Sequence, residues 1–296
     1  MNYYNEIKNK LIDNEVYSRV KDYSKERHRV ITYFETGKLL YEAGSKYGED
    51  IIGQYSKKLI KEVGKQYSER TLRRMRQLYT MFDNEKWSPM VTKLTWSHYI
   101  VLMSIKDINE INYYLNICII QSLSKRELEE RIKHNEYERI PEETKNKLIK
   151  KEKSEVKDFV KNPILIKNIY NYSEISEKIL KQLILEHIEQ FMKELGNSFC
   201  FIGSEYKIKI GEKYNYIDLL LYNIKFKCYV VVELKITELK KEYIGQIQTY
   251  MNYIDKNIKT INENKIIGII IVRKDNKFIM EYCSDKRILA TQYILS

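Results

Sequence analysis

The chain has 296 residues, of which 43% are hydrophobic and 31% are charged, a composition typical of a soluble globular protein with room for two domains. It contains no apolar run long enough for a membrane-spanning helix and no signal-peptide pattern at its N-terminus, so we expect a cytoplasmic protein. The four cysteines and four histidines are scattered without metal-ligand spacing, which argues against a zinc site, while the net charge of +11 favours a polyanionic partner.

Residues 1–150 carry a helical pattern throughout. Apolar residues recur at three- and four-residue spacing, as at Val30, Ile31 and Phe34. Ser124 is followed three residues later by Glu127, the pattern of a capping box at the start of a helix. No alternating strand pattern occurs here, and we therefore expect an all-helical domain over 1–150.

Within this half, residues 56–82 predict a helix, a glycine-containing turn and a second helix that opens at Ser68. That spacing is typical of a helix-turn-helix. Five basic residues of this segment are candidate DNA contacts: Lys65, Arg70, Arg73, Arg74 and Arg76. Arginines placed in this way bind backbone phosphates without reading sequence. The alternative is a surface helix whose arginines pair with acids of another subunit.

The residues from Pro141 to Pro163 are charged and poor in apolar side chains, which marks a linker. We place this linker at 151–162, between the helical domain and a second domain at 163–296. In the second domain, residues 173–195 predict one amphipathic helix that stops at Gly196. Strand-like runs follow at 199–210, 216–222 and 227–235, then a helix near 240–257. The runs 266–273, 278–284 and 287–295 are expected to be further strands.

Charged residues interrupt two of these apolar runs. Asp218 lies inside YIDLLLY, and Glu233 and Lys235 end KCYVVVELK. A short connection makes the two strands antiparallel neighbours, and alternation puts Glu233 and Lys235 on one face. Two carboxylates brought so close repel each other unless a cation lies between them, and Mg²⁺ is the natural choice, with Mn²⁺ as a substitute.

A lysine beside such a pair stabilises the charge that develops on a phosphate under attack, and a bound metal acidifies the attacking water. These residue types therefore indicate metal-assisted hydrolysis of a phosphodiester. The competing interpretation is structural, because an aspartate in a strand can cap a turn and a Glu-x-Lys can mark an exposed edge.

The same segment resembles the PD-(D/E)XK nuclease signature, with Asp218 as its aspartate and Glu233-Leu234-Lys235 as its E-x-K. Ile217 stands where the signature has proline, a structural position. Residues 173–296, through LILEHIEQFMKELGNSFCFIGSEYKI, YIDLLLY, VVVELKI and EYIGQIQTYMNYID, resemble the YhcG-type nuclease-domain proteins of bacteria. ERTLRRMRQLY, LTWSHYIVLMSIKD and SLSKRELEERI resemble the helical domain that precedes the nuclease in that family.

The resemblance implies further site residues. Gln246 matches a glutamine that many members place on the helix after E-x-K. A glutamate of the first helix often completes the metal site, and we favour Glu186, on the flank of the apolar face, over Glu189. The backbone carbonyl of Leu234 is expected to join Asp218 and Glu233 as a metal ligand.

We thus expect an α+β chain of two domains. An all-helical, helix-turn-helix-like domain precedes a restriction-endonuclease-like α/β core with a mixed sheet. The expected function is a Mg²⁺-dependent DNA endonuclease. The alternatives are a non-catalytic nucleic-acid-binding scaffold that keeps the fold and a nuclease that cleaves RNA. A homodimer would let such an enzyme cut both strands, although the sequence shows no clear dimer seam.

Overall fold

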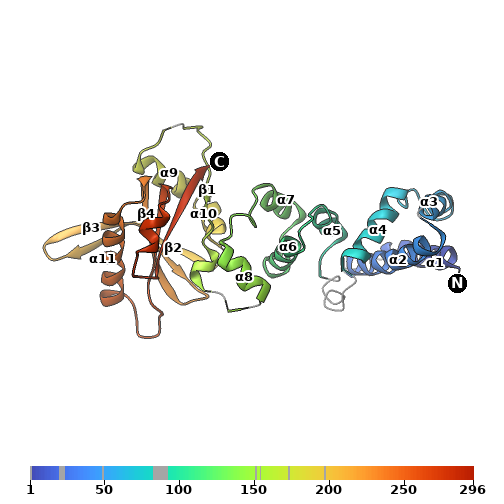
Figure 1. The fold of residues 1–296 in the computed structure, drawn as a ribbon, viewed down its shortest axis with the longest axis horizontal. Helices are drawn as coiled ribbons and strands as arrows, with labels where there is room; N and C mark the ends of the chain where they lie inside the picture. The colour runs from blue at the N-terminus through green and yellow to red at the C-terminus, as the bar shows by residue number, and fades with distance from the viewer. Residues whose placement is uncertain are drawn as a thin grey trace. The chain divides into compact units, whose positions relative to one another are not determined.

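The computed structural model describes residues 2–19, 24–48, 50–82, 93–150, 152–153, 155–172, 174–196 and 198–296. These residues form two compact units, Met1–His134 and Asn135–Ser296 (Figure 1). The division lies before the linker expected at 151–162, and the structure places Val156 and Val160, which flank the middle of that segment, in the core of the second unit.

The first unit is helical, as the periodicity predicts. Its helices are α1 (Tyr3–Ser18), α2 (Lys25–Tyr47), α3 (Ile51–Glu62), α4 (Glu69–Phe82), α5 (Trp96–Leu102), α6 (Ile108–Gln121) and α7 (Lys125–Lys133). The capping box expected at Ser124 is present, with the Glu127 side chain and backbone both bonded to Ser124. Helix α4 buries the face formed by Leu72, Met75, Leu78 and Tyr79.

The second unit begins with α8 (Glu142–Lys150), the short 3₁₀ helix η1 (Val156–Phe159) and strand β1 (Ile164–Ile166). A buried ion cluster ties this segment to the helix that ends at Leu195. The Arg139 guanidinium bonds the Glu194 carboxylate and the Pro163 carbonyl, and the Lys161 ammonium donates to the Glu194 carbonyl at 2.8 Å. Charges buried in this way are tolerated because each has an opposite charge or a carbonyl as partner.

The described strands form a mixed six-stranded sheet in the order β1-β6-β5-β4-β3-β2. Strands β2 (Phe199–Ile210), β3 (Lys213–Asn223) and β4 (Cys228–Glu238) are antiparallel neighbours. Strands β5 (Ile267–Lys274) and β6 (Ile288–Leu295) continue parallel to β4, and β1 is parallel to β6. The predicted mixed sheet is therefore confirmed, and β1 is the strand that the sequence did not reveal.

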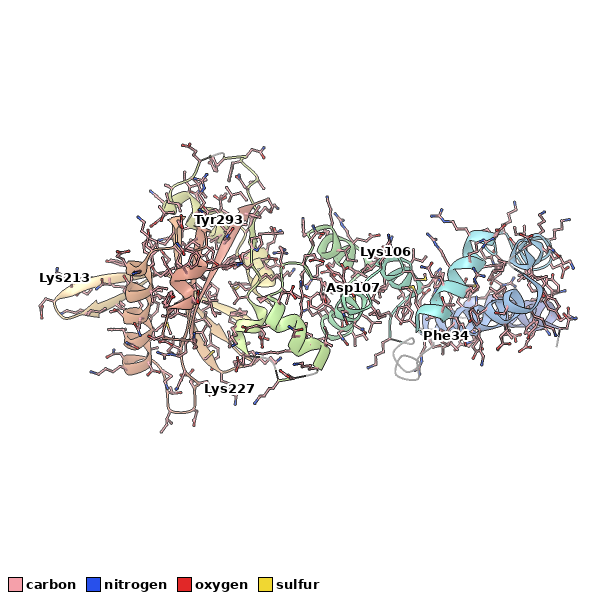
Figure 2. All side chains as sticks on the ribbon, in the orientation of Figure 1. Phe34, Lys106, Asp107, Lys213, Lys227 and Tyr293 are labelled. Atoms are coloured by element: carbon pink, nitrogen blue, oxygen red, sulfur yellow. The ribbon has the colours of Figure 1, made fainter. Side chains whose placement is uncertain are left out.

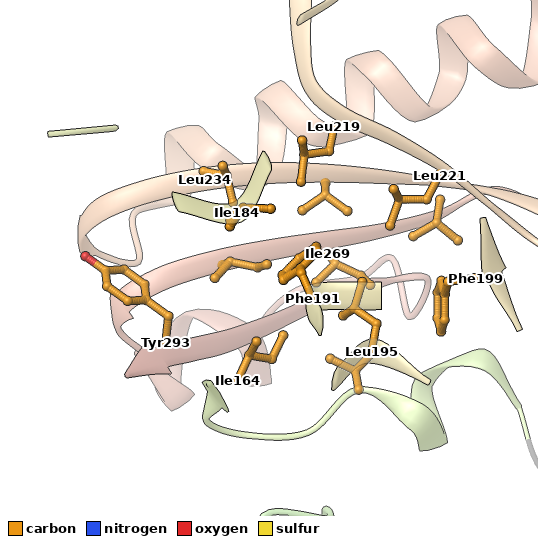
Figure 3. Packing of buried hydrophobic residues seen from close by; sticks show 14 of the residues in the cluster. Ile164, Ile184, Phe191, Leu195, Phe199, Leu219, Leu221, Leu234, Ile269 and Tyr293 are labelled. Carbon is orange, nitrogen blue, oxygen red and sulfur yellow. The ribbon is translucent and has the colours of Figure 1, made fainter. Parts of the chain in front are cut away.

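Helices cover both faces of the sheet. On one face, α9 (Glu177–Glu186) and α10 (Ile188–Leu195) bury Ile184, Phe191 and Leu195 against strand residues such as Leu219 and Leu234 (Figure 3). On the other face, α11 (Lys241–Asn257) packs Ile247 and Met251 against β5. Burial on both sides explains why β5 is apolar without alternation.

Two expectations for this unit are wrong. The helix predicted over 173–195 is broken at His187, whose φ of −122° and ψ of 37° end α9 and start α10. Each half packs on different strands, which an uninterrupted apolar stripe does not reveal. Residues 278–284 do not form a strand: Asn276 caps a short helix, α12 (Lys277–Glu281), on which Phe278 is exposed.

No helix in the described part of the chain combines the length and apolar character that a membrane crossing requires.

Candidate active site

The candidate site lies where strands β3 and β4 separate. Their ladder runs from Asn223 paired with Cys228 to Leu219 paired with Val232. Beyond this ladder, the side chains of Asp218 and Glu233 each accept a hydrogen bond from a backbone amide of the opposite strand. The Leu234 amide donates to Asp218 Oδ2 at 3.0 Å, and the Asp218 amide to Glu233 Oε1 at 3.5 Å. The carboxylates thus take up backbone donors that the splayed strands leave unpaired.

Glu233 is the most deeply buried of the charged residues predicted at the site. It is 1% exposed, and Lys235 lies beside it with 3.3 Å between Nζ and Oε2. Burial raises the pKa of the Glu233 carboxyl to about 7, and the neighbouring charge of Asp218 adds to that rise. Ionising the Glu233 carboxyl therefore costs free energy, and a bound cation would reduce that cost.

Lys235 lies among acids and one aromatic ring. Burial acts to lower the pKa of its ammonium, but the carboxylates of Glu233, Glu177 and Asp218 outweigh burial, so the pKa is raised and the lysine stays charged. Its Nζ is 3.9 Å from Glu177 Oε2 and 5.4 Å from the ring centre of Tyr243, in the first turn of α11. A fixed positive charge beside two carboxylates suits a role at a phosphate.

Helix α9 supplies a second lysine that the sequence did not single out. Lys181 Nζ lies 2.8 Å from Asp218 Oδ1 and 3.1 Å from Glu205 Oε1 on β2. Glu177 and Lys181 are four residues apart, so both project from the same face of α9 toward the sheet. The four-residue spacing was the signal in the sequence that could have pointed to this pair. It indicates a site only when the face of α9 that meets the ends of β3 and β4 is known.

The predicted glutamates of this helical segment lie elsewhere. Glu186 is exposed and accepts a hydrogen bond from Gln182 at 2.8 Å, and Glu189 pairs with Lys193 at 2.7 Å. Glu177, and not Glu186, is therefore the α9 acid that the structure brings to Lys235. A metal role for Glu186 stays a prediction that none of these contacts supports.

Gln246 is half-buried on α11 and donates to the Tyr250 hydroxyl at 3.1 Å. It lies one turn after Tyr243, on the side of α11 that faces Lys235. The Leu234 side chain projects into the core beneath α9 and α10, and Leu234 pairs with Ile271 in the ladder between β4 and β5. The structure thus unites Asp218, Glu233 and Lys235 directly, with Leu234 between them in the chain.

The donor chemistry at this site fits a hard divalent ion. In the described residues no three His, Cys, Asp or Glu side chains are grouped so as to hold a metal. Mg²⁺ nevertheless needs only one or two carboxylates, because it keeps several of its own waters. The mutually repelling carboxylates of half-buried Asp218 and buried Glu233 meet that requirement.

In the first unit, the predicted DNA contacts lie on or just before α4. Lys65 and Arg70 are exposed, Arg74 and Arg76 are half-buried, and Arg73 pairs with Glu69 at 2.7 Å. Arg73 and Arg76 line an open hollow of about 520 Å³ between α2 and α4, together with Tyr41, Gly44, Ser45, Gln77 and Thr80. This face of α4 therefore gathers positive charge beside a cavity.

Comparison with known proteins matches both halves of the chain. Residues 157–296 match the YhcG PDDEXK nuclease domain, and residues 11–139 match the DUF1016 N-terminal domain. The chain is 25% identical over 286 residues to the putative nuclease YhcG of Escherichia coli (strain K12), a match that covers 82% of this chain and 74% of that protein.

Two solved structures show weaker overlaps. A repair endonuclease from Pyrococcus abyssi overlaps with a TM-score of 0.30 at 16% identity, over 41% of this chain. An EndoMS complex with double-stranded DNA overlaps with a TM-score of 0.31 at 17% identity, over 42% of this chain. Each overlap spans 48% of the solved chain, about half its length.

Proposed function

The chain belongs to the proteins that join a DUF1016 N-terminal domain to a YhcG PDDEXK nuclease domain, and we propose that it is a Mg²⁺-dependent DNA endonuclease. The observation that carries this proposal is the meeting of Asp218, Glu233 and Lys235 where β3 and β4 separate. We also propose that the protein acts in the cytoplasm.

Each of these residues has a distinct task in the proposed reaction. Asp218, Glu233 and the Leu234 carbonyl would hold the ion. Bound there, it would supply an acidified water for attack on the phosphorus and would neutralise charge on the phosphate. Lys235, fixed between Glu233 and the Tyr243 ring, stabilises the negative charge that grows on the phosphate oxygens. Gln246 positions water or phosphate from α11.

The N-terminal unit is proposed to bind DNA through α3 and α4 as a helix-turn-helix. Arg70, Arg73, Arg74 and Arg76 would contact phosphates from α4, and Lys65 from the preceding turn. The burial of Leu72, Met75 and Leu78 on the opposite face of α4 supports this assignment, because it turns the arginine-bearing face away from the core. Phosphate contacts of this kind would give affinity for DNA of any sequence and a strong dependence on salt.

Cleavage of plasmid, forked and four-way-junction DNA with Mg²⁺ tests the proposal. Asp218→Ala and Lys235→Ala are expected to reduce the cleavage rate at least about a hundred-fold, since each removes a group that stabilises the transition state. Cleavage by both variants at the wild-type rate would show that the site is misassigned.

Matched RNA substrates in the same assay address the RNA-cleaving alternative, and cleavage of RNA alone would overturn the DNA assignment. A scaffold would cut neither but would still bind nucleic acid. Cleavage of both strands of a duplex needs two sites, which a homodimer of this chain would supply. Light scattering measures whether the protein is a homodimer.

A further inference from the structure

Strands β2 and β3 extend beyond the sheet as a two-stranded arm, residues 206–217. The ladder between them continues from Tyr206 paired with Ile217 to Ile210 paired with Lys213, whereas β4 pairs with β3 only as far as Leu219. Gly211, with a φ of 59°, makes the turn at the tip. The hairpin projects past α11, with Lys213 at its tip (Figures 1 and 2).

The two faces of the arm differ in chemistry. One face packs Tyr206, Ile208, Ile210 and Ile217 into or against the core beneath α11. The other, which we call the open face, carries Lys207, Lys209, Tyr214 and Tyr216, all exposed. Tyr214 and Tyr216 are 57% and 53% exposed, so neither ring is packed into the core.

The side chains of the open face are organised in cross-strand pairs. Lys207 lies opposite Tyr216, and Lys209 lies opposite Tyr214. The Lys207 ammonium also lies 3.8 Å from the ring centre of Tyr214, a cation–π contact that holds both side chains along the strand. No acidic residue is on this face within the arm. Glu212 lies in the turn, 3.9 Å from Lys209.

The open face leads directly to the candidate active site. Asp218 follows Tyr216 by two residues on β3, and Glu205 precedes Lys207 by two residues on β2, so both acids lie at the base of the arm. Lys181 of α9 contacts both of them there. A two-residue step along a strand is about 6.8 Å, which equals two steps of the axial rise of duplex DNA.

We propose that the open face of the arm binds a DNA strand and guides it to Asp218. Lys207 and Lys209 hold backbone phosphates, while Tyr214 and Tyr216 contact sugars and bases. This inference rests on the proposed nuclease function and adds a second substrate-binding surface, distinct from the arginines of α4. Lysines with interleaved aromatic rings suit a strand whose phosphates and bases alternate along its length.

The test is DNA binding followed by fluorescence anisotropy in EDTA, at several salt concentrations. The double variant Lys207→Ala/Lys209→Ala is expected to bind at least about ten-fold more weakly than wild type. Its plot of log affinity against log salt should be shallower by about 2, since two phosphate contacts are lost. The matched control is Lys225→Ala/Lys227→Ala, which removes the same charge from the turn between β3 and β4, away from the arm (Figure 2).

A second variant separates the two chemistries of the open face. Tyr214→Ala/Tyr216→Ala is expected to lose about ten-fold in affinity for single-stranded DNA with the salt slope unchanged, because stacking releases no counterions. Melting temperatures equal to that of wild type show that all variants are folded.

The outcomes distinguish this inference from the proposed function. If wild type cleaves DNA with Mg²⁺ while the Lys207/Lys209 variant binds as the Lys225/Lys227 control does, the arm inference alone is overturned. If the arm variant loses affinity but wild type cleaves no nucleic acid, the arm stands as a binding surface and the nuclease proposal fails. If wild type binds no nucleic acid, both fail.

Discussion

At the scale of single residues, Glu233 and Asp218 make the site costly to fold without a cation. Glu233 is buried next to a like charge, and its pKa is raised to about 7 as a result. Lys235 offsets part of the repulsion through its contact with Glu233, and Lys181 does so through its contact with Asp218. A site built in this way gains stability whenever a divalent cation binds.

Replacing one carboxylate should therefore stabilise the metal-free protein. Glu233→Gln is expected to raise the free energy of unfolding in EDTA by about 1 kcal/mol, since a buried like-charge contact is removed while an acceptor oxygen remains. Thermal unfolding measures this change. Millimolar Mg²⁺ should raise the melting temperature of wild type but not of this variant. Lower stability of the variant in EDTA would contradict the prediction.

Replacing Lys181 should have the opposite effect on stability, because Lys181 is a counter-ion of Asp218 and Glu205. Lys181→Met is expected to lower the melting temperature in EDTA, and Mn²⁺ should restore more stability to this variant than to wild type. The control is Lys178→Met, an exposed residue of the same helix. Equal effects of the two substitutions would show that Lys181 has no special role at Asp218.

At the scale of elements, close helix packing in the first unit depends on a glycine. A Cβ added at Gly37 in α2 would lie 2.1 Å from the Met75 carbonyl oxygen in α4. Backbone atoms cannot move aside as a side-chain end can, so the two helices would have to separate. The contact between α2 and α4 thus requires the absence of a side chain at this position.

Gly37→Ala is expected to destabilise the first unit by about 3 kcal/mol, the upper end of overpacking effects. Gly245 in α11 offers the matched control, because a Cβ there meets nothing within 4 Å. Gly245→Ala should be neutral or stabilising by up to about 1 kcal/mol, as expected for a helix interior. Denaturant unfolding followed by circular dichroism compares them, and equal stability changes would refute the packing argument.

The elements also differ in how well the sequence revealed them. Strand β2 has the predicted bounds, and β4, α11 and β5 begin within one residue of their predicted starts. These segments have strong local patterns, either β-branched runs or a regular apolar stripe. The break at His187 and the helix at 277–281 depend instead on packing and on the Asn276 cap. Short-range periodicity carries little information about either.

At the scale of the whole molecule, the chain has two units, and each contains buried apolar residues of its own. The candidate active site lies wholly within the second unit, on β3 and β4. We therefore expect two transitions in calorimetric unfolding, and Mg²⁺ should shift only the transition that belongs to the second unit. Gly37→Ala should lower only the other transition, which assigns each to its unit. One transition that moves as a whole with Mg²⁺ would disprove independent unfolding.

The sequence by itself determined the helical first half, most strands of the second, and the Asp218, Glu233 and Lys235 constellation. Those features follow from patterns that span a few residues, because alternation and turn length decide which side chains share a strand end. Only the tertiary structure decided that α9 presents Lys181 and Glu177 to that end, and that β2 and β3 continue beyond it as an arm. The face that a helix turns to a sheet is set by packing between distant segments, and the site is completed by those contacts.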